Sequence, residues 1–210
     1  RRLSKIKNSP TTNPIFTTIV DNFEGDRFNS PNDLVVSTNG DIFFTDPTYG
    51  FMFLSDFTFD ESVKELDFSG VYRYNSEAGI ELISNELDLP NGLALSNDER
   101  YLYVNSSNTD EAPIIIKIDL KNENKSDLFF DGTELAKKYP GSFDGLKIHS
   151  SGNIFTTGPN GILVLSPTGK LLANIKFKDE LTNCAFDSDE NYLYVTGFSF
   201  VARIALKNNI

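Results

Sequence analysis

The sequence is poor in the residues that build disulfides, zinc sites and serine-type catalytic triads. Its 210 residues include one cysteine, Cys184, and one histidine, His149. A single cysteine cannot form an internal disulfide, and a single histidine excludes most zinc sites and most Ser-His-Asp catalysis. The cysteine content therefore leaves the redox compartment of the protein open.

Basic residues and long apolar runs are also scarce. Nineteen Lys and Arg residues stand against thirty Asp and Glu residues, which gives a net charge of −11. Nucleic acids and anionic membrane surfaces bind clustered basic side chains, so this balance argues against both partners. The longest apolar runs, such as residues 114–116, are far too short to span a bilayer. With 39% hydrophobic and 23% charged residues, the composition is that of an ordinary soluble globular protein.

Four segments of the chain share one pattern. In each, a polar residue opens a short apolar run, a turn follows, and a second strand-like run begins 10 or 11 residues after the polar residue. The four polar residues are Asn32, Asn91, Asp144 and Asn183. Third runs follow at residues 71–74, 114–118, 162–165 and 201–205. Fourth runs follow the first three of these, at residues 80–83, 127–130 and 171–175.

This repeat predicts an all-β fold of the propeller type. Short β-branched and aromatic runs between Gly, Pro, Asn and Asp are typical of antiparallel strands joined by hairpins. Four strands per unit, with one unit every ~40 to 50 residues, indicate propeller blades. The spacing between successive units varies, so we expect constant blades joined by variable connections.

The predicted strands do not close a ring. Residues 3–6 and 16–20 resemble the third and fourth strands of a blade, and the last unit lacks a fourth strand. An open arc of blades would leave edge strands and half a core exposed. We therefore expect residues 1–210 to form one partial propeller domain, which lacks an N-terminal segment of roughly one and a half blades. The start at Arg1, without an initiator Met or a signal peptide, is consistent with this expectation.

Two segments depart from the repeat. Residues 47–67 form the largest insertion and are rich in phenylalanine. Such a loop is expected to pack over something, either as a lid on the mouth of the central channel or folded back on its own blade. Residues 133–139 predict one short helix, with Asp131 or Thr133 as its N-cap and Pro140-Gly141 as its end.

The four in-phase polar residues form a candidate site. The first strand of every blade is innermost in a propeller, so Asn32, Asn91, Asp144 and Asn183 should converge at one end of the axis. Three amides and one carboxylate suit a hard divalent cation. Asn and Asp before a strand are also ordinary turn residues. From the residues alone, a cation site and a set of turns are both consistent with the pattern.

Other notable residues have structural interpretations. Gly92 and Gly145 are expected to permit close backbone approach where blades meet. His149 follows a first strand and is expected at the surface, remote from the polar ring. Cys184 should point into its blade as a small buried hydrophobe rather than act as a nucleophile. Residues 46–50 are interpreted as a turn that contains Pro and Gly.

Several motifs together resemble a known family. They are RFNSPNDLVV at 27–36, GDIFFTDPTYG at 40–50, LPNGLALS at 89–96, ERYLYV at 99–104, DGLK at 144–147, GNIFTTGP at 152–159 and TNCAF at 182–186. These motifs span nearly the whole chain and are similar to the gluconolactonase branch of the SMP-30/gluconolactonase/LRE-like family. The part from residue 27 to residue 50 is the most specific.

The resemblance implies a six-bladed β-propeller, of which about four blades are present here. It also implies lactone hydrolysis with one divalent cation held by a first-blade glutamate, an asparagine and an aspartate. The last two match Asn91 and Asp144, and the aspartate is also the general acid/base. A substrate-binding asparagine matches Asn32, and Asn183 matches a position near the channel. The glutamate has no counterpart in this sequence.

The sequence therefore predicts metal-dependent hydrolysis of a lactone, with a sugar lactone such as gluconolactone as the expected substrate. Asp144 would be the general acid/base, Asn91 and Asp144 the metal ligands, and Asn32 and Asn183 the substrate-binding residues. The metal is left open among Ca²⁺, Zn²⁺, Mg²⁺ and Mn²⁺, as are the oligomeric state and the compartment. Two alternatives remain: a non-catalytic propeller that binds a ligand or partner, and an organophosphate hydrolase of similar architecture. The lone, badly placed His149 weakens the second alternative.

Overall fold

The computed structural model describes residues 1–7, 14–56, 58–107 and 113–206, and its main elements are four antiparallel sheets. We number these sheets as blades in chain order. Blade 1 contains β5 (Leu34–Val36), β6 (Ile42–Asp46), β7 (Gly70–Asn75) and β8 (Gly79–Ser84). Blade 2 contains β9 (Pro90–Leu95), β10 (Tyr101–Ser106), β11 (Ile114–Asp119) and β12 (Lys125–Asp131). Blade 3 contains β13 (Leu146–Ile148), β14 (Ile154–Gly158), β15 (Gly161–Leu165) and β16 (Leu171–Lys176), and blade 4 contains β17 (Leu181–Phe186), β18 (Tyr192–Gly197) and β19 (Val201–Ala205).

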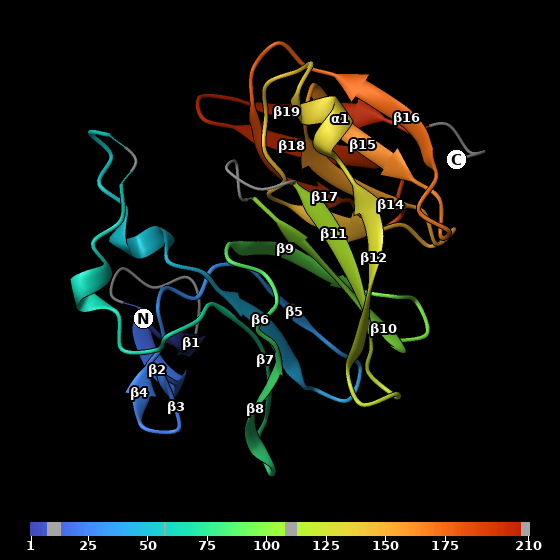
Figure 1. Ribbon diagram of the computed structural model, residues 1–210. Coiled ribbons are helices and arrows are strands. Elements are labelled where there is room, and N and C mark those ends of the chain that lie inside the picture. Colours follow the sequence, from blue (N-terminus) through green and yellow to red (C-terminus); the bar gives the residue numbers. More distant parts are fainter. Residues whose placement is uncertain (8–13, 57, 108–112, 207–210) are drawn as a thin grey trace.

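The strand order inside each blade follows the chain order, which is the topology of a propeller blade. Figure 1 shows the first strands β5, β9 and β17 on the inner side of an arc and the fourth strands β8, β12 and β16 on its outer side. The first strands of consecutive blades contact one another. These observations confirm the predicted all-β propeller and its four blades, while closure at six blades stays an implication of the family.

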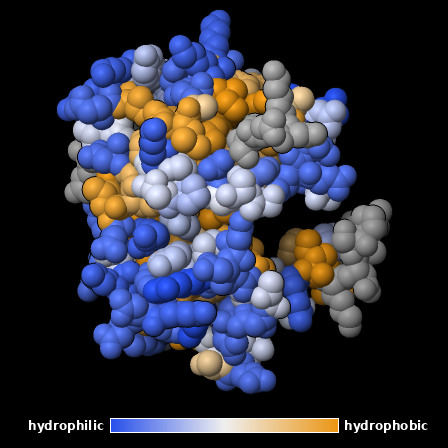
Figure 2. Space-filling model, turned by 90° about the vertical axis from the view of Figure 1, so that its right-hand side faces the viewer, coloured by the Kyte–Doolittle hydropathy of each residue, from blue (hydrophilic) through white to orange (hydrophobic). Residues whose placement is uncertain are grey.

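Apolar side chains from alternate positions fill the spaces between the blades. On β10, Leu102 and Val104 pack toward blade 1, whereas Tyr103 packs toward blade 3. This division follows from the period of a strand, in which successive side chains point to opposite faces. Each inner blade therefore contributes to two of the core layers, which join the blades into a continuous stack. Figure 2 shows further apolar side chains at the surface of the upper part of the molecule, where blades 3 and 4 lie.

The N-terminal residues form strands that pack against blade 1. The predicted pair corresponds to β1 (Leu3–Lys7) and β2 (Ile15–Val20), which run antiparallel, and a small hairpin of β3 (Asn22–Phe23) and β4 (Asp26–Arg27) follows. Leu3 and Phe28 join Phe44 and Tyr72 of blade 1 in one buried cluster. Ile15 remains 69% exposed. The N-terminal pair thus covers only part of its own apolar surface.

The insertion mostly folds back on its own blade. It contains two short 3₁₀ helices, η1 (Tyr49–Phe51) and η2 (Glu61–Val63), and an isolated bridge between Met52 and Phe59. Phe51 is buried beneath the guanidinium of Arg1, and Leu66 joins the apolar cluster of blade 1. Phe57 lies outside the described residues. Between the two interpretations of the sequence, the structure favours the folded-back loop for most of the segment and leaves Tyr49 at the channel.

The predicted helix is shorter than expected and begins with a different cap. Helix α1 covers Thr133–Ala136, and its N-cap is Gly132 rather than Asp131 or Thr133. The carboxylate of Asp131, the residue before this N-cap, still accepts the backbone N–H of Thr133 at 2.9 Å. It therefore satisfies one of the free donors at the start of the helix. Within the described ranges, no helix is long and apolar enough to cross a membrane.

Antiparallel topology sorts the connections into two ends of the propeller. The turns after first and third strands lie at one end, which we call the turn end. The loops after second strands, together with the links between blades, lie at the other end, which we call the loop end. The insertion and the N-terminal ends of all four first strands belong to the loop end.

Candidate active site

Two of the four predicted polar residues meet at the loop end. Asn91, the second residue of β9, is buried, and its side chain lies within hydrogen-bonding reach of the half-buried carboxylate of Asp144, two residues before β13. Asn183 lies beside Gly145, but its Oδ1 accepts the N–H of Cys184 at 2.8 Å. Asn32 is exposed, and in the described part of the chain no hydrogen bond joins its side chain to Asn91 or Asp144. The polar ring is therefore a central pair with two outer members.

Asn91 presents an unpaired carbonyl oxygen. Its Nδ2 donates to Ser107 Oγ at 2.9 Å, whereas its buried Oδ1 has no hydrogen-bond partner among the described residues. A buried polar atom without a partner is destabilising, and such atoms are rare in native proteins. Amide and carboxylate oxygens are the ligands of hard divalent cations. The donor set of Asn91 and Asp144 therefore fits a cation, although no group of three or more His, Cys, Asp or Glu residues gathers within the described ranges.

The pKa of the Asp144 carboxyl group is raised above its ordinary value. Burial raises its pKa to about 6, and the negative charge of Asp33 adds to the effect, while the side chains of Asn91 and Lys147 oppose it. A carboxyl group with a pKa near neutrality can both accept and return a proton at physiological pH. Asp144 thus has the electrostatics of a general acid/base.

The backbone beneath this pair is fixed by polar residues of the second strands. Thr45 Oγ1 donates to Asn91 O at 2.8 Å, and Asn105 Nδ2 donates to Asp144 O at 2.8 Å. The N–H of Asp144 donates to Thr157 Oγ1 at 3.0 Å. Because Thr45, Asn105 and Thr157 are fully buried, these bonds are shielded from water. They hold the two first strands at a fixed separation.

The two predicted glycines explain how closely those strands approach. A Cβ atom on Gly92 would collide with the carbonyl oxygen of Asp144. A Cβ atom on Gly145 would collide with the side chain of Asn183. Glycine is therefore required at both positions for close contact between neighbouring blades, as predicted.

Sequence reasoning missed Tyr49, which the interpretation of residues 46–50 assigned to a turn. The backbone does turn there, into η1, but the Tyr49 hydroxyl is buried against Ser107 and Asn91. Burial raises the pKa of Tyr49, partly opposed by these two side chains. The signal in the sequence is the placement of a tyrosine three residues after a second strand, where the chain reaches the loop end.

An ion pair across the channel was also missed. Lys147 Nζ of blade 3 lies 3.6 Å from Asp33 Oδ2 of blade 1. This carboxylate oxygen is buried and has no hydrogen-bond partner among the described residues. The pair spans the first strand of blade 2, whereas the core layers join neighbouring blades.

A second group of buried polar atoms lies beside the insertion. Asp46 is fully buried, and its Oδ2 accepts the N–H of Asn29 at 2.7 Å. Burial raises the pKa of Asp46 to about 7, although the backbone N–H donors of Asn29 and Ser30 lower it in part. Asp46 Oδ1 and the Tyr72 hydroxyl have no partners among the described residues. The sequence pattern indicates an ordinary turn at residues 46–50 and gives no sign of this buried carboxyl group.

Cys184 lies where the sequence predicted, and His149 is remote from the polar ring as expected, but its side chain is only 15% exposed because its ring packs against Phe155 and Phe186. His149 is at the turn end, where its Nε2 is 3.4 Å from Glu190 Oε2. Cys184 is buried and free, and burial raises the pKa of its thiol to about 12. A thiol that holds its proton so strongly is a poor nucleophile.

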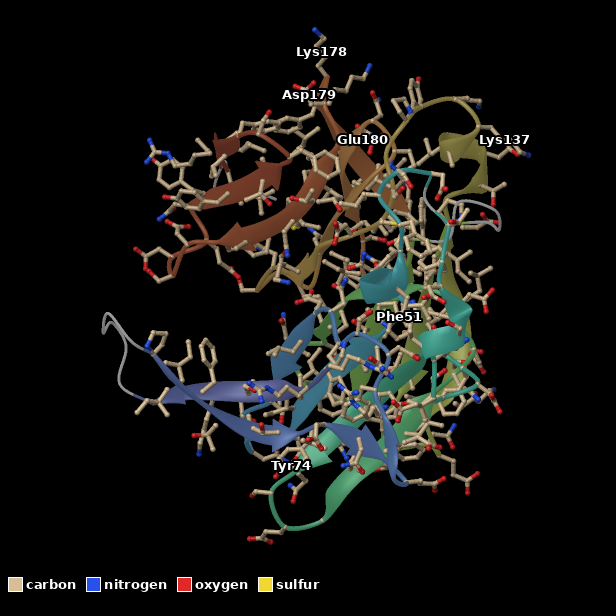
Figure 3. All side chains as sticks on the ribbon, turned by 90° about the vertical axis from the view of Figure 1, so that its left-hand side faces the viewer. Phe51, Tyr74, Lys137, Lys178, Asp179 and Glu180 are labelled. Atoms are coloured by element: carbon tan, nitrogen blue, oxygen red, sulfur yellow. The ribbon has the colours of Figure 1, made fainter. Side chains whose placement is uncertain are left out.

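A cavity of about 250 Å³ lies beside Ser107 at the loop end. Its lining is formed by Ser107, Pro113, Ala136, Tyr139, Pro140, Gly141, Ser142 and Glu180. Ser107 connects this cavity to Asn91 through the hydrogen bond between their side chains. Figure 3 shows Glu180 and Lys137 in the upper part of the molecule, above Phe51 of the insertion. The arrangement offers a carboxylate, an unpaired amide oxygen and a small adjoining space.

Comparison with known proteins identifies close relatives. The chain is 36% identical to the gluconolactonase of Zymomonas mobilis subsp. mobilis, over 90% of this chain and 54% of that protein. It is 25% identical to the lactonohydrolase oryL of Aspergillus oryzae, over 89% of this chain and 46% of that protein. The chain therefore spans about half the length of the curated relatives it matches.

Solved structures agree with the sequence comparison. A gluconolactonase from Xanthomonas campestris superposes with a TM-score of 0.79 at 28% identity, covering 92% of this chain and 62% of that chain. A calcium-binding regucalcin from Agrobacterium tumefaciens shares the fold, with a TM-score of 0.60 at 17% identity over 79% of this chain and 52% of that chain. The family model for the SMP-30/Gluconolactonase/LRE-like region matches residues 6–199. The chain belongs to the SMP-30/gluconolactonase/LRE-like family.

Proposed function

We propose that the protein hydrolyses a lactone, with a sugar lactone as the expected substrate, at the pair formed by Asn91 and Asp144. One observation carries the proposal: the side chain of Asn91, whose buried Oδ1 has no partner among the described residues, lies within hydrogen-bonding reach of a carboxyl group whose pKa is raised to about 6. A general acid/base and an electrophilic aid to the carbonyl group are what lactone opening requires. The gluconolactonase and lactonohydrolase relatives support the same class of reaction.

In this mechanism Asp144 moves the protons. Its carboxylate accepts a proton from a water molecule whose oxygen adds to the lactone carbonyl carbon. The bond from this carbon to the ring oxygen then breaks, and Asp144 returns the proton to the departing alkoxide, which gives a hydroxy acid. Asn91 Oδ1 and Asp144 would hold a divalent cation, which supplies Lewis-acid polarisation of the carbonyl group. Asn32 and Asn183, at the outer positions, would orient the hydroxyl groups of the substrate.

The test is proton release from a panel of sugar lactones and aliphatic lactones. The protein should be expressed at the full length that its gene encodes, treated with EDTA, and then supplied with Ca²⁺, Mg²⁺, Mn²⁺ or Zn²⁺. We expect hydrolysis of at least one sugar lactone, its loss with EDTA, and its recovery with one of the cations. Absence of hydrolysis across the panel with every cation would contradict the proposed function.

A further inference from the structure

The Tyr49 hydroxyl is held in place at the candidate site by contacts on both sides of its backbone. The N–H of Gly50 donates to Ser30 Oγ at 2.9 Å, and the N–H of Met52 donates to Tyr49 O at 3.1 Å. Phe51, two residues further along the chain, is buried against Arg1. Tyr49 is therefore placed by a local turn that buries Phe51, and its own side chain reaches across to blade 2.

The hydroxyl group meets two side chains, Asn91 and Ser107, whose donor groups are already engaged. Asn91 Nδ2 donates to Ser107 Oγ, and Ser107 Oγ donates its proton to the carbonyl oxygen of Phe143. The Tyr49 hydroxyl is buried beside both and makes no hydrogen bond of good geometry within the described part of the chain. A hydroxyl group carries one proton that it can donate, and the Tyr49 hydroxyl donates it to no acceptor within the described part of the chain.

The Tyr49 hydroxyl is thus a hydrogen-bond donor in a site that also contains the acceptor oxygens of Asn91 and Asp144. Asn91 Oδ1 is an acceptor that has no partner among the described residues, while its Nδ2 is engaged by Ser107. Asp144, when ionised, is a pure acceptor. A carbonyl oxygen that gains negative charge during hydrolysis is stabilised by donors placed in advance, and acceptors alone would repel it. Among the side chains that meet at Asn91, Tyr49 supplies the free donor.

We propose that the Tyr49 hydroxyl is a catalytic hydrogen-bond donor to the oxygen that gains negative charge as water adds to the lactone carbonyl. The inference rests on the proposed function and adds a residue to it. Tyr49 keeps its proton throughout, and it donates a stronger hydrogen bond to the charged oxygen than to the neutral carbonyl group. The nearby cavity at the loop end shares Ser107 with this group of side chains.

The test is the substitution Tyr49→Phe, which removes the hydroxyl group and keeps the ring. The matched control is Tyr74→Phe on β7, at the turn end of blade 1 and well apart from Phe51 in Figure 3. For Tyr49→Phe we expect kcat to fall about 100-fold with KM changed by less than about threefold. The thermal midpoint should stay unchanged or rise, because the substitution removes a buried hydroxyl group without a partner. Tyr74→Phe should leave kcat and KM unchanged.

Other results would overturn the inference. They are a Tyr49→Phe variant with the wild-type kcat, one in which KM alone rises, and one that unfolds or whose thermal midpoint falls together with its activity. If the wild-type protein hydrolyses no lactone, the proposed function fails and this inference fails with it. If the wild-type protein is active and Tyr49→Phe is equally active, the inference fails and the proposed function stands.

Discussion

The two ends of the propeller differ in whether their polar groups have hydrogen-bond partners. At the turn end, Glu99 of blade 2 accepts the N–H and the hydroxyl of Thr38 of blade 1, both at 2.8 Å. Glu190 of blade 4 accepts the N–H of Ser150 of blade 3 at 3.0 Å, and Asn97 of blade 2 donates to Ser150 O at 2.9 Å. Neighbouring blades are thus joined turn to turn by charged or amide groups.

At the loop end, by contrast, polar atoms are buried without partners. The atoms of this kind in the described part of the chain all lie at or next to the loop end: Asn29 Oδ1, Asp33 Oδ2, Asp46 Oδ1, Tyr49 Oη, Tyr72 Oη, Asn91 Oδ1 and Asn174 Oδ1. Buried polar groups are normally satisfied, so a concentration of exceptions at one end indicates where a ligand completes the structure. The turn end contributes stability, and the loop end carries the candidate chemistry.

The most severe test of this contrast is Asp144→Asn. Replacing the proposed general acid/base should lower kcat about 1,000-fold, because proton transfer by a positioned side chain contributes on this order. The free energy of unfolding should not fall, because burial of a carboxylate whose pKa is raised is itself destabilising. Proton-release kinetics and thermal unfolding measure the two effects. Wild-type activity in this variant would remove Asp144 from the mechanism.

Asp46→Asn tests the second buried carboxyl group through pH. Burial raises the pKa of Asp46 in the folded chain from 3.8 to about 7, so the folded chain holds a proton that the unfolded chain releases above about pH 4. The contribution of this group to stability is therefore greatest below about pH 4 and falls as the pH rises toward 7, by on the order of 4 kcal/mol. In Asp46→Asn this part of the decline should disappear. Urea unfolding at pH 4, 5.5 and 7 measures it, and identical slopes for variant and wild type would contradict the assignment.

Lys147→Met tests the ion pair across the channel. Removal of the ammonium leaves Asp33 Oδ2 buried without a cationic partner, which should cost roughly 2 kcal/mol of stability, since Lys147 is partly exposed. It also removes a positive charge that lowers the pKa of Asp144, so the acid limb of the activity profile should move to higher pH. The double variant Lys147→Met/Asp33→Asn is the control and should regain most of the lost stability. An unchanged acid limb in Lys147→Met would show that the ammonium does not act on Asp144.

The smallest effect is expected at the turn end, from Glu99→Ala. Loss of the bonds to Thr38 should lower the free energy of unfolding by about 1 kcal/mol. Kinetic constants should not change, because the substitution lies at the opposite end from Asn91 and Asp144. Glu99→Gln is the matched control, since its amide oxygen can still accept the Thr38 N–H. A clear fall of kcat in Glu99→Ala would mean that the two ends are not independent.

The blade pattern could be predicted from the sequence because it is local. A first strand, a tight turn and a second strand occupy about fifteen residues, and the turn residues fix the register of each hairpin. The close approach at Gly92 and Gly145 could be predicted for the same reason, because these residues directly follow the in-phase Asn91 and Asp144. The N-cap of α1 was wrong by one residue because Asp131 binds the same N–H from outside the helix.

The contacts between blades could not be predicted in this way. The pairing of Asp33 with Lys147, and the reach of Tyr49 to Asn91, depend on how far each blade is rotated relative to the others. That rotation is set by packing across the core layers, which no local pattern encodes. The repeat placed Asn32 in phase with Asn91 but could not tell that its side chain would be exposed while the neighbouring Asp33 would face Asp144.

The buried bonds from Thr45, Asn105 and Thr157 have a consequence for how this molecule could be changed. They anchor Asn91 and Asp144 through main-chain atoms of the strands, and none of them comes from Tyr139, Glu180 or the other residues that line the nearby cavity. Among the described residues, Ser107 is the one lining residue that also binds the Asn91 side chain, so the rest of the cavity wall is separate from the candidate pair. A library that randomises Tyr139 and Glu180 could alter which molecules enter while the spacing of Asn91 and Asp144 stays as it is.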